Sequence, residues 1–168
     1  LTSIETFGFD NCNISSLPET RYAFGSFIAP TDPPQLAVCG GWWMGKPNSS
    51  DCLTLNVTSA LWERGTFTNG LLKDGVQGVI SMEGEGVFVV QSSGISVLEP
   101  GSQSWVTGPV FSASAVCACN VSSTSFVTIH MNDTYNVREY FVNNGKAELG
   151  PIDSLESWPS ILTKRYGP

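Results

Sequence analysis

The sequence has little charge, few basic side chains and no long apolar run. Only 14% of its 168 residues are charged, and 8 basic against 15 acidic side chains give a formal net charge of −7. So few positive charges disfavour binding to nucleic acid or to an anionic membrane surface, and we expect neither as a partner. The apolar runs, such as residues 87–90, are far too short to cross a bilayer, so we expect no membrane span.

Histidine is nearly absent, which limits the catalytic chemistry that we expect. His130 is the single histidine, so a Ser-His-Asp triad would depend on it alone, and nothing nearby resembles a nucleophile elbow. One histidine without a Cys-x-x-Cys pair also disfavours a zinc site. We therefore expect a non-enzymatic protein with no metal and no cofactor, in which His130 is a structural or surface residue.

Cysteine is sparse but unevenly placed. Cys39 and Cys52 bracket a twelve-residue loop between two strand-like runs, which favours a disulfide between them. Cys117 and Cys119 lie on one face of a strand and cannot easily pair with each other. A bond from Cys12 to either one is predicted, and the fifth cysteine would then be free or would pair outside this chain.

Asparagine occurs in an unusual context. Five of the ten asparagines begin an Asn-x-Ser/Thr sequon, where roughly two would do so by chance. Together with the cysteines, this excess predicts a secreted glycoprotein, the alternative being a Ser/Thr-rich cytosolic chain. Glycosylated positions must reach solvent, so they also predict surface loops or solvent-facing strand positions. The predicted N-glycosylation sites are Asn13, Asn48, Asn56, Asn120 and Asn132.

Residues 35–62 contain the strongest local pattern. A short apolar run, residues 36–39, ends at Gly40-Gly41, a second strand-like run covers 53–57, and a third opens at Trp62. The glycine pair suits a position where φ is positive or two backbones approach closely. Trp62 offers a large anchor for burial at the start of its strand.

The pattern recurs further along the chain. Residues 98–105 align with 55–62 without a gap, which places Trp105 43 positions after Trp62. Residues 112–119, 125–129 and 137–142 predict three more strands, and Asn143-Asn144-Gly145 is a strong hairpin signal. Because no segment predicts an amphipathic helix, we expect an all-β fold.

This arrangement resembles the kelch repeat, in which each copy forms one four-stranded blade of a β-propeller. The resemblance is carried by Gly40-Gly41 and by a tryptophan about twenty residues later. The pair Cys39 and Cys52 is similar to the disulfide-bearing kelch domains of secreted animal proteins. Gln91-Ser92 and Ile129-His130 depart from the glycine pair, and Ala147 departs from the tryptophan.

The resemblance implies about three blades in an incomplete ring. It divides the chain into a first blade at 17–68, a second at 75–110, a third at 111–152 and the start of a further blade at 153–168. Three blades do not close a propeller, and no signal peptide is recognisable at the start. We therefore expect a piece of a longer chain, the alternative being several copies that complete one another.

The loop after the glycine pair is the predicted binding site. In kelch propellers this loop lies at one mouth of the ring, so Trp42, Trp43 and Met44 are the expected contact residues, unless the aromatic rings simply pack on a neighbouring blade. The expected function is an extracellular module for protein–protein interaction or structural assembly, as in a matrix or fibre, with N-linked glycans and a protein partner or self-association. The alternatives are a non-catalytic part of a kelch-fold secreted enzyme (a copper radical oxidase or a glycosidase) whose active site lies on missing blades, or a carbohydrate-binding module.

Overall fold

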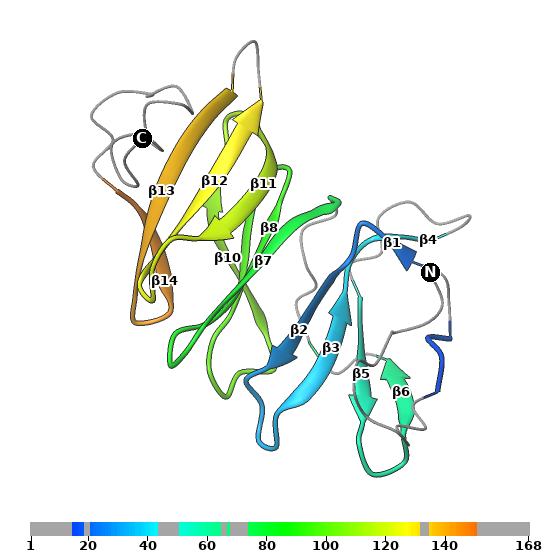
Figure 1. Cartoon of the computed structure of the whole chain (residues 1–168). Coiled ribbons are helices and arrows are strands. Elements are labelled where there is room, and N and C mark those ends of the chain that lie inside the picture. Colours follow the sequence, from blue (N-terminus) through cyan, green and yellow to red (C-terminus); the bar gives the residue numbers. More distant parts are fainter. Residues whose placement is uncertain are drawn as a thin grey trace, which may run out of the picture.

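The computed structural model describes residues 15–18, 21–43, 51–64, 67, 74–131 and 135–150. Within these residues the chain forms β-strands and no helix, so the expected all-β class is confirmed (Figure 1). Twelve of the strands make three four-stranded antiparallel sheets, named here sheets I, II and III in chain order. A two-residue ladder joins β1 (Arg21–Tyr22) to β4 (Trp42–Trp43).

Each sheet is a simple meander of consecutive strands, apart from the short β4 between the second and third strands of sheet I. Sheet I consists of β2 (Gly25–Ala29), β3 (Gln35–Cys39), β5 (Cys52–Asn56) and β6 (Leu61–Arg64). Sheet II consists of β7 (Val76–Met82), β8 (Gly86–Gln91), β9 (Gly94–Leu98) and β10 (Trp105–Val110). Sheet III consists of β11 (Ser114–Asn120), β12 (Ser125–Met131), β13 (Tyr135–Asn143) and β14 (Lys146–Leu149).

The burial pattern of the strands follows from their place in the stack. β8 and β9 are buried at every position, as expected for strands with a sheet on each face. β2 instead alternates buried and exposed residues, because only one of its faces meets another sheet. The hairpin between β13 and β14 turns through Asn144 and Gly145, both with positive φ (51° and 72°), which confirms the predicted turn.

The three sheets lie side by side, with sheet II between the other two (Figure 1). The first strand of each sheet packs against the first strand of the next, so β7 touches both β2 and β11. Glycine permits these contacts. A Cβ added to Gly25 would lie 2.5 Å from Val79 Cγ2, and one added to Gly78 would lie 2.9 Å from Ala118 Cβ. The chain therefore returns from the last strand of one sheet to the inner edge of the next.

Two apolar clusters hold the stack together. The first lies between sheets I and II, where Trp105 packs edge-on against Phe27 with ring centroids 5.8 Å apart. The second lies between sheets II and III, where Phe126 stands 5.7 Å from Phe88 and stacks on Tyr140. Full burial of one such side chain stabilises a fold by roughly 1.5–3 kcal/mol, so these clusters are the main source of cohesion between sheets.

The series of sheets is open at both ends. Within the described residues, the face of sheet I turned away from sheet II has no sheet against it, and neither does the face of sheet III turned away from sheet II. The exposed side chains of Ile28 and Met131, on these two faces, leave apolar surface uncovered at both ends.

Candidate functional site

The loop that follows β3 leaves the sheet through the predicted glycine pair. Gly40 and Gly41 both have positive φ, 68° and 89°. A Cβ on Gly41 would lie 2.8 Å from the carbonyl oxygen of Tyr22 and 3.0 Å from Cβ of Phe24. Both reasons foreseen for glycine, the left-handed backbone and the close approach of another segment, therefore apply at this turn.

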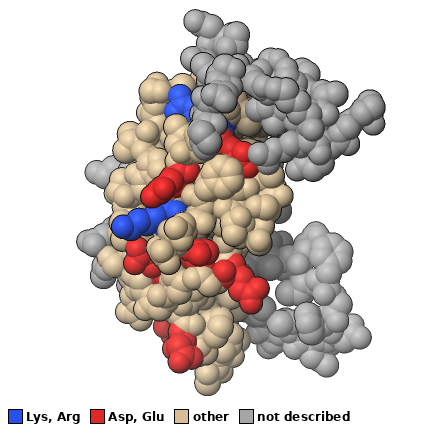
Figure 2. All heavy atoms as spheres, turned by 90° about the vertical axis from the view of Figure 1, so that its left-hand side faces the viewer, with Lys and Arg blue, Asp and Glu red and all other residues tan. Residues whose placement is uncertain are grey.

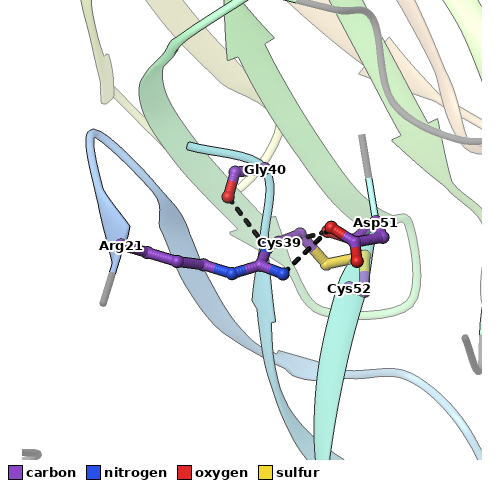
Figure 3. Close-up of a disulfide and its surroundings, with 5 residues drawn as sticks. All are labelled: Arg21, Cys39, Gly40, Asp51 and Cys52. Atoms are coloured by element: carbon purple, nitrogen blue, oxygen red, sulfur yellow. Dashed lines mark hydrogen bonds and ion pairs between the residues drawn. A yellow bond between two sulfur atoms is a disulfide. The ribbon is translucent and has the colours of Figure 1, made fainter. Parts of the chain in front are cut away.

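A disulfide closes the base of this loop. Cys39 and Cys52 are bonded, as expected, and occupy directly opposed positions on β3 and β5 (Figure 3). The backbone N–H of Gly40 donates a 3.0 Å hydrogen bond to the Asp51 carbonyl one residue further out. Both cysteine side chains are buried between sheets I and II, so the bridge is shielded from reagents in solution.

Arg21 secures both ends of the same loop and is almost fully buried. Its Nη1 donates hydrogen bonds to the carbonyl oxygens of Gly40 (3.0 Å) and Asp51 (3.1 Å), while Nη2 lies 2.9 Å from Asp51 Oδ1 (Figure 3). A planar guanidinium can satisfy several acceptors at fixed angles, which a lysine ammonium cannot do equally well. Arg21 thus acts as a clamp beneath the loop.

Asp51 is shared between two arginines of unequal exposure. Its second carboxylate oxygen pairs with Arg64, whose side chain is 52% exposed, whereas the side chain of Arg21 is fully buried. Burial of an unpaired guanidinium would cost several kcal/mol, so the ion pair with Asp51 offsets the cost of burying Arg21. Sequence reasoning assigned no role to this ion-paired cluster. The one available signal was Arg21 itself, three residues after Pro18.

The structure places two of the three predicted contact residues. The backbone of Trp42 and Trp43 forms β4 and pairs with Tyr22 and Arg21 respectively, so the start of the loop is a short ladder rather than the irregular segment that was expected. Met44 lies outside the described residues, as does the loop up to residue 50. The disulfide, the glycine turn and Arg21 hold the two ends of this loop together.

His130 is a buried structural residue and not a surface one. Its Nδ1–H donates to the carbonyl of Ala113 (2.8 Å), so Nε2 accepts the hydroxyl hydrogen of Thr128 (2.6 Å). Burial lowers the pKa of His130, and the nearby Arg138 lowers it further, against the opposing effect of the Ala113 bond. The ring also meets Phe111 edge-on at 4.6 Å, which leaves it closed to a substrate in solution.

A matching anchor exists in sheet II. Gln91, also fully buried, donates from Nε2 to the carbonyl of Asp74, and its Oε1 accepts a hydrogen bond from Ser96. In both sheets a side chain at the end of the second strand binds a carbonyl just before the first strand. The separation is 17 residues in each case. Gln91 and His130 therefore fix the entry of the chain into their sheets.

Cys117 and Cys119 are free thiols in the structure. Cys119 is exposed and Cys117 is half-buried, both on β11, and partial burial followed by the proximity of Cys117 raises the pKa of Cys119. Cys12 lies outside the described residues, so a bond from it to either thiol stays a prediction.

Two of the five sequons lie within the described residues. Asn120 is exposed at the end of β11. Asn56 is half-buried at the end of β5, where its Oδ1 accepts hydrogen bonds from the backbone N–H groups of Thr58 and Ser59. Asn13, Asn48 and Asn132 lie outside the described residues, and glycosylation of all five remains a prediction.

The surface seen in Figure 2 carries scattered acidic side chains with few basic ones between them. At the hairpin tips of sheets II and III, Glu85 accepts a 2.6 Å hydrogen bond from the backbone N–H of Gly145. No group of three or more metal-ligating side chains is arranged to hold an ion in the described part of the chain. This acidic surface would attract a cationic partner in preference to an anionic one.

No protein-family model matches the chain, and a comparison with curated proteins finds no significant relative. Among the described residues, no helix is long and apolar enough to pass through a bilayer. The arrangement of the three sheets and the loop base are therefore the observations from which function has to be inferred.

Proposed function

We propose that the chain is a segment of a secreted, kelch-like β-propeller that serves as a non-catalytic module for extracellular protein–protein interaction or structural assembly. The observation that carries this proposal is the stacking of three consecutive four-stranded meanders, inner strand against inner strand. Propeller blades are four-stranded sheets repeated around an axis, and this order of sheets is what such a repeat requires. The 17-residue anchors of Gln91 and His130 support a repeat whose sequence has diverged.

Extracellular location is supported by the buried disulfide and by the five sequons. Disulfides persist in oxidising compartments, and Cys39–Cys52 spans a loop that a small β-rich domain benefits from closing. A recognition role for this loop follows from its construction. The clamp of Arg21 and the disulfide hold its two ends, and rigid scaffolds that present loops are a common basis of binding.

The test is to express the chain in a eukaryotic secretory host and to follow both secretion and binding. We expect a secreted product whose mass falls after glycosidase treatment, and saturable binding to decellularised extracellular matrix. Replacing Trp42 and Trp43 by alanine should weaken that binding at least several-fold without changing the melting temperature. The matched control is Val57→Ala, an exposed apolar residue in the β5–β6 turn, which should bind as the parent chain does.

Three outcomes would overturn the proposal. An unglycosylated product retained in the cell would contradict the extracellular location. Absence of matrix binding, or binding indifferent to both tryptophans, would contradict the role of the loop. Binding of isolated glycans that is lost with Trp42 and Trp43 would replace the proposal with a carbohydrate-binding module.

A further inference from the structure

Both internal interfaces of the stack join unlike faces. On the face of sheet II that meets sheet I, Leu98 pairs with Trp105 across neighbouring strands. The same pair recurs in sheet I as Leu55 and Trp62, but on the face that meets no sheet. The outward face of sheet I therefore corresponds to the face of sheet II that packs against sheet I.

A linking segment already lies over part of this first open face. Leu17 packs on Val38 and Leu53, and the Trp62 indole N–H donates to the Ser15 carbonyl (2.9 Å). The two internal interfaces contain comparable side chains. Phe67 lies 5.9 Å from Trp105 between sheets I and II, and Phe111 lies among His130 and Tyr140 between sheets II and III. The outward side of sheet I is thus built as one half of another interface.

Part of the first open face is apolar and exposed to solvent, although Ser26 and Arg64 also lie on it. Ile28 on β2 is 59% exposed, and Leu36, its cross-strand neighbour on β3, is only half-buried. An isolated exposed apolar side chain needs no explanation, but Ile28 continues the surface formed by Leu17, Val38 and Leu53.

The second open face belongs to sheet III. On this face Ile129 pairs with Cys117 and Val127 pairs with Cys119, Val127 itself is buried, and Glu139 lies opposite it on β13. Toward its ends, Met131 is 49% and Phe141 is 43% exposed. The equivalent face of sheet II, which carries Phe88 and Val90, is fully buried against sheet III. The second open face is therefore partly apolar, with Glu139 and Glu148 beside its apolar side chains, and no other sheet of the described residues lies against it.

We propose that the two open faces bind each other between two copies of this chain, sheet III of one copy against sheet I of the other. This inference rests on the proposed role in structural assembly. In both internal interfaces one face of a sheet packs against the opposite face of the next sheet, and the proposed contact repeats this order. The contact is therefore heterologous, because two different surfaces meet in it, rather than self-complementary. Two such contacts between two copies of three sheets make a ring of six, within the four to eight blades at which propellers close.

The described sequons leave both open faces clear of sugar. Asn56 follows Leu55 on β5, so its side chain points to the side opposite the first open face. Asn120 pairs with Phe126, which faces sheet II, so it too lies off the second open face. Glycans at these positions would not obstruct the pairing.

The test is the solution mass of the deglycosylated chain, measured by light scattering at tens of micromolar concentration. We expect about twice the 18.0 kDa of one chain. Ile28→Glu on the first open face and Met131→Glu on the second should each give a monomer, because each places a buried charge in both contacts of the ring. Val110→Glu is the matched control, since this 73% exposed residue lies on β10 of sheet II.

Mixing the two charged variants separates this arrangement from other dimers. The Ile28→Glu copy keeps an intact sheet III face and the Met131→Glu copy keeps an intact sheet I face, so a mixed dimer with one good contact should form. A dimer joined by identical faces would not be restored by mixing. Restoration also shows that both variants are folded, which excludes unfolding as the cause of their dissociation.

Alkylation of Cys119 gives a second measurement. The exposed thiol on the second open face should react more slowly as the concentration of the parent chain rises, while the Met131→Glu variant should show no such dependence. A monomeric parent chain, or a dimer unaffected by both charges, would overturn the inference. Neither result bears on matrix binding by the Trp42–Trp43 loop, so failure here is distinguishable from failure of the proposed function.

Discussion

Replacing Arg21 by methionine is expected to destabilise the chain more than any surface change of equal size. The side chain is fully buried and provides two hydrogen bonds to carbonyls at the ends of the loop, plus an ion pair with Asp51. Breaking a buried ion pair costs about 3–5 kcal/mol. We expect about 3 kcal/mol, the lower end of that range, because Arg64 still pairs with the Asp51 carboxylate.

The assay is equilibrium unfolding in urea, followed by tryptophan fluorescence and circular dichroism. A loss of about 3 kcal/mol divided by an m value of about 2 kcal/mol/M lowers the urea midpoint by about 1.5 M, with m unchanged. Arg64→Met is the control at the same carboxylate. Its 52% exposed side chain should contribute no more than about 1 kcal/mol.

The comparison of the two arginines can refute the reasoning. Equal losses from Arg21→Met and Arg64→Met would show that burial does not set the strength of the clamp. A loss below about 1 kcal/mol for Arg21→Met would show that the carbonyls of Gly40 and Asp51 find other donors at little cost. Arg21→Lys should fall between the parent and Arg21→Met, because an ammonium keeps the charge but not the planar set of donors.

Three further predictions concern other parts of the stack. Replacing both Cys39 and Cys52 by alanine should lower the free energy of unfolding by about 3 kcal/mol, because the unfolded chain is no longer constrained by the loop that the disulfide closes. Because the disulfide is buried, a thiol titration should show that it resists reductant until denaturant is added. Ready reduction of the native protein would contradict this burial. The pKa of His130 is lowered in the folded state, so the unfolded chain binds a proton at this residue more tightly than the folded chain does. The free energy of unfolding should therefore fall as the pH drops below about 6.5, the pKa of a histidine in an unfolded chain. The loss should reach up to about 1.4 kcal/mol per pH unit until the pH approaches the folded-state pKa. The urea midpoint of the His130→Gln variant should depend less on pH over this interval than that of the parent chain. An unchanged pH dependence in the variant would show that other groups cause the loss of stability. Gly78→Val should cost about 1–3 kcal/mol by forcing β7 from Ala118 of β11, whereas a melting temperature equal to the parent's would show that the inner strands can separate freely.

The local features of the fold could be predicted from the sequence. The strands of residues 36–39, 125–129 and 137–142, the Asn-Gly hairpin and the glycine turn each follow from residue types within a few positions. The Cys39–Cys52 bond was predictable for the same reason, since the two cysteines end neighbouring runs.

Features that depend on distant residues could not be predicted. The pairing of Asp51 with Arg21 joins positions 30 residues apart, and nothing in their local sequence indicates it. The burial of His130 also arises from stacking, because the side chain is enclosed only when Phe111 folds back over sheet III. Kelch membership, secretion and glycosylation remain predictions.

Buried polar side chains fix the position at which the chain enters each of the three four-stranded sheets. A meander can stack only if the chain enters its inner strand at a fixed place, and backbone carbonyls just before that strand must find a donor when they are buried. Gln91 supplies this donor to Asp74 and His130 supplies it to Ala113. In sheet I the positions of donor and acceptor are exchanged. The donor, Arg21, lies before the inner strand β2, and the acceptor is the carbonyl of Gly40, just after the second strand β3.

The three sheets satisfy a buried carbonyl near the inner strand with different donors. In sheets II and III, Gln91 and His130 near the end of the second strand donate to the carbonyls of Asp74 and Ala113. In sheet I the second strand ends at Cys39, and Gly40, which follows with positive φ, presents the carbonyl that Arg21 binds. A polar side chain therefore satisfies the carbonyl in each sheet, although neither the residue type nor its place in the sheet is the same.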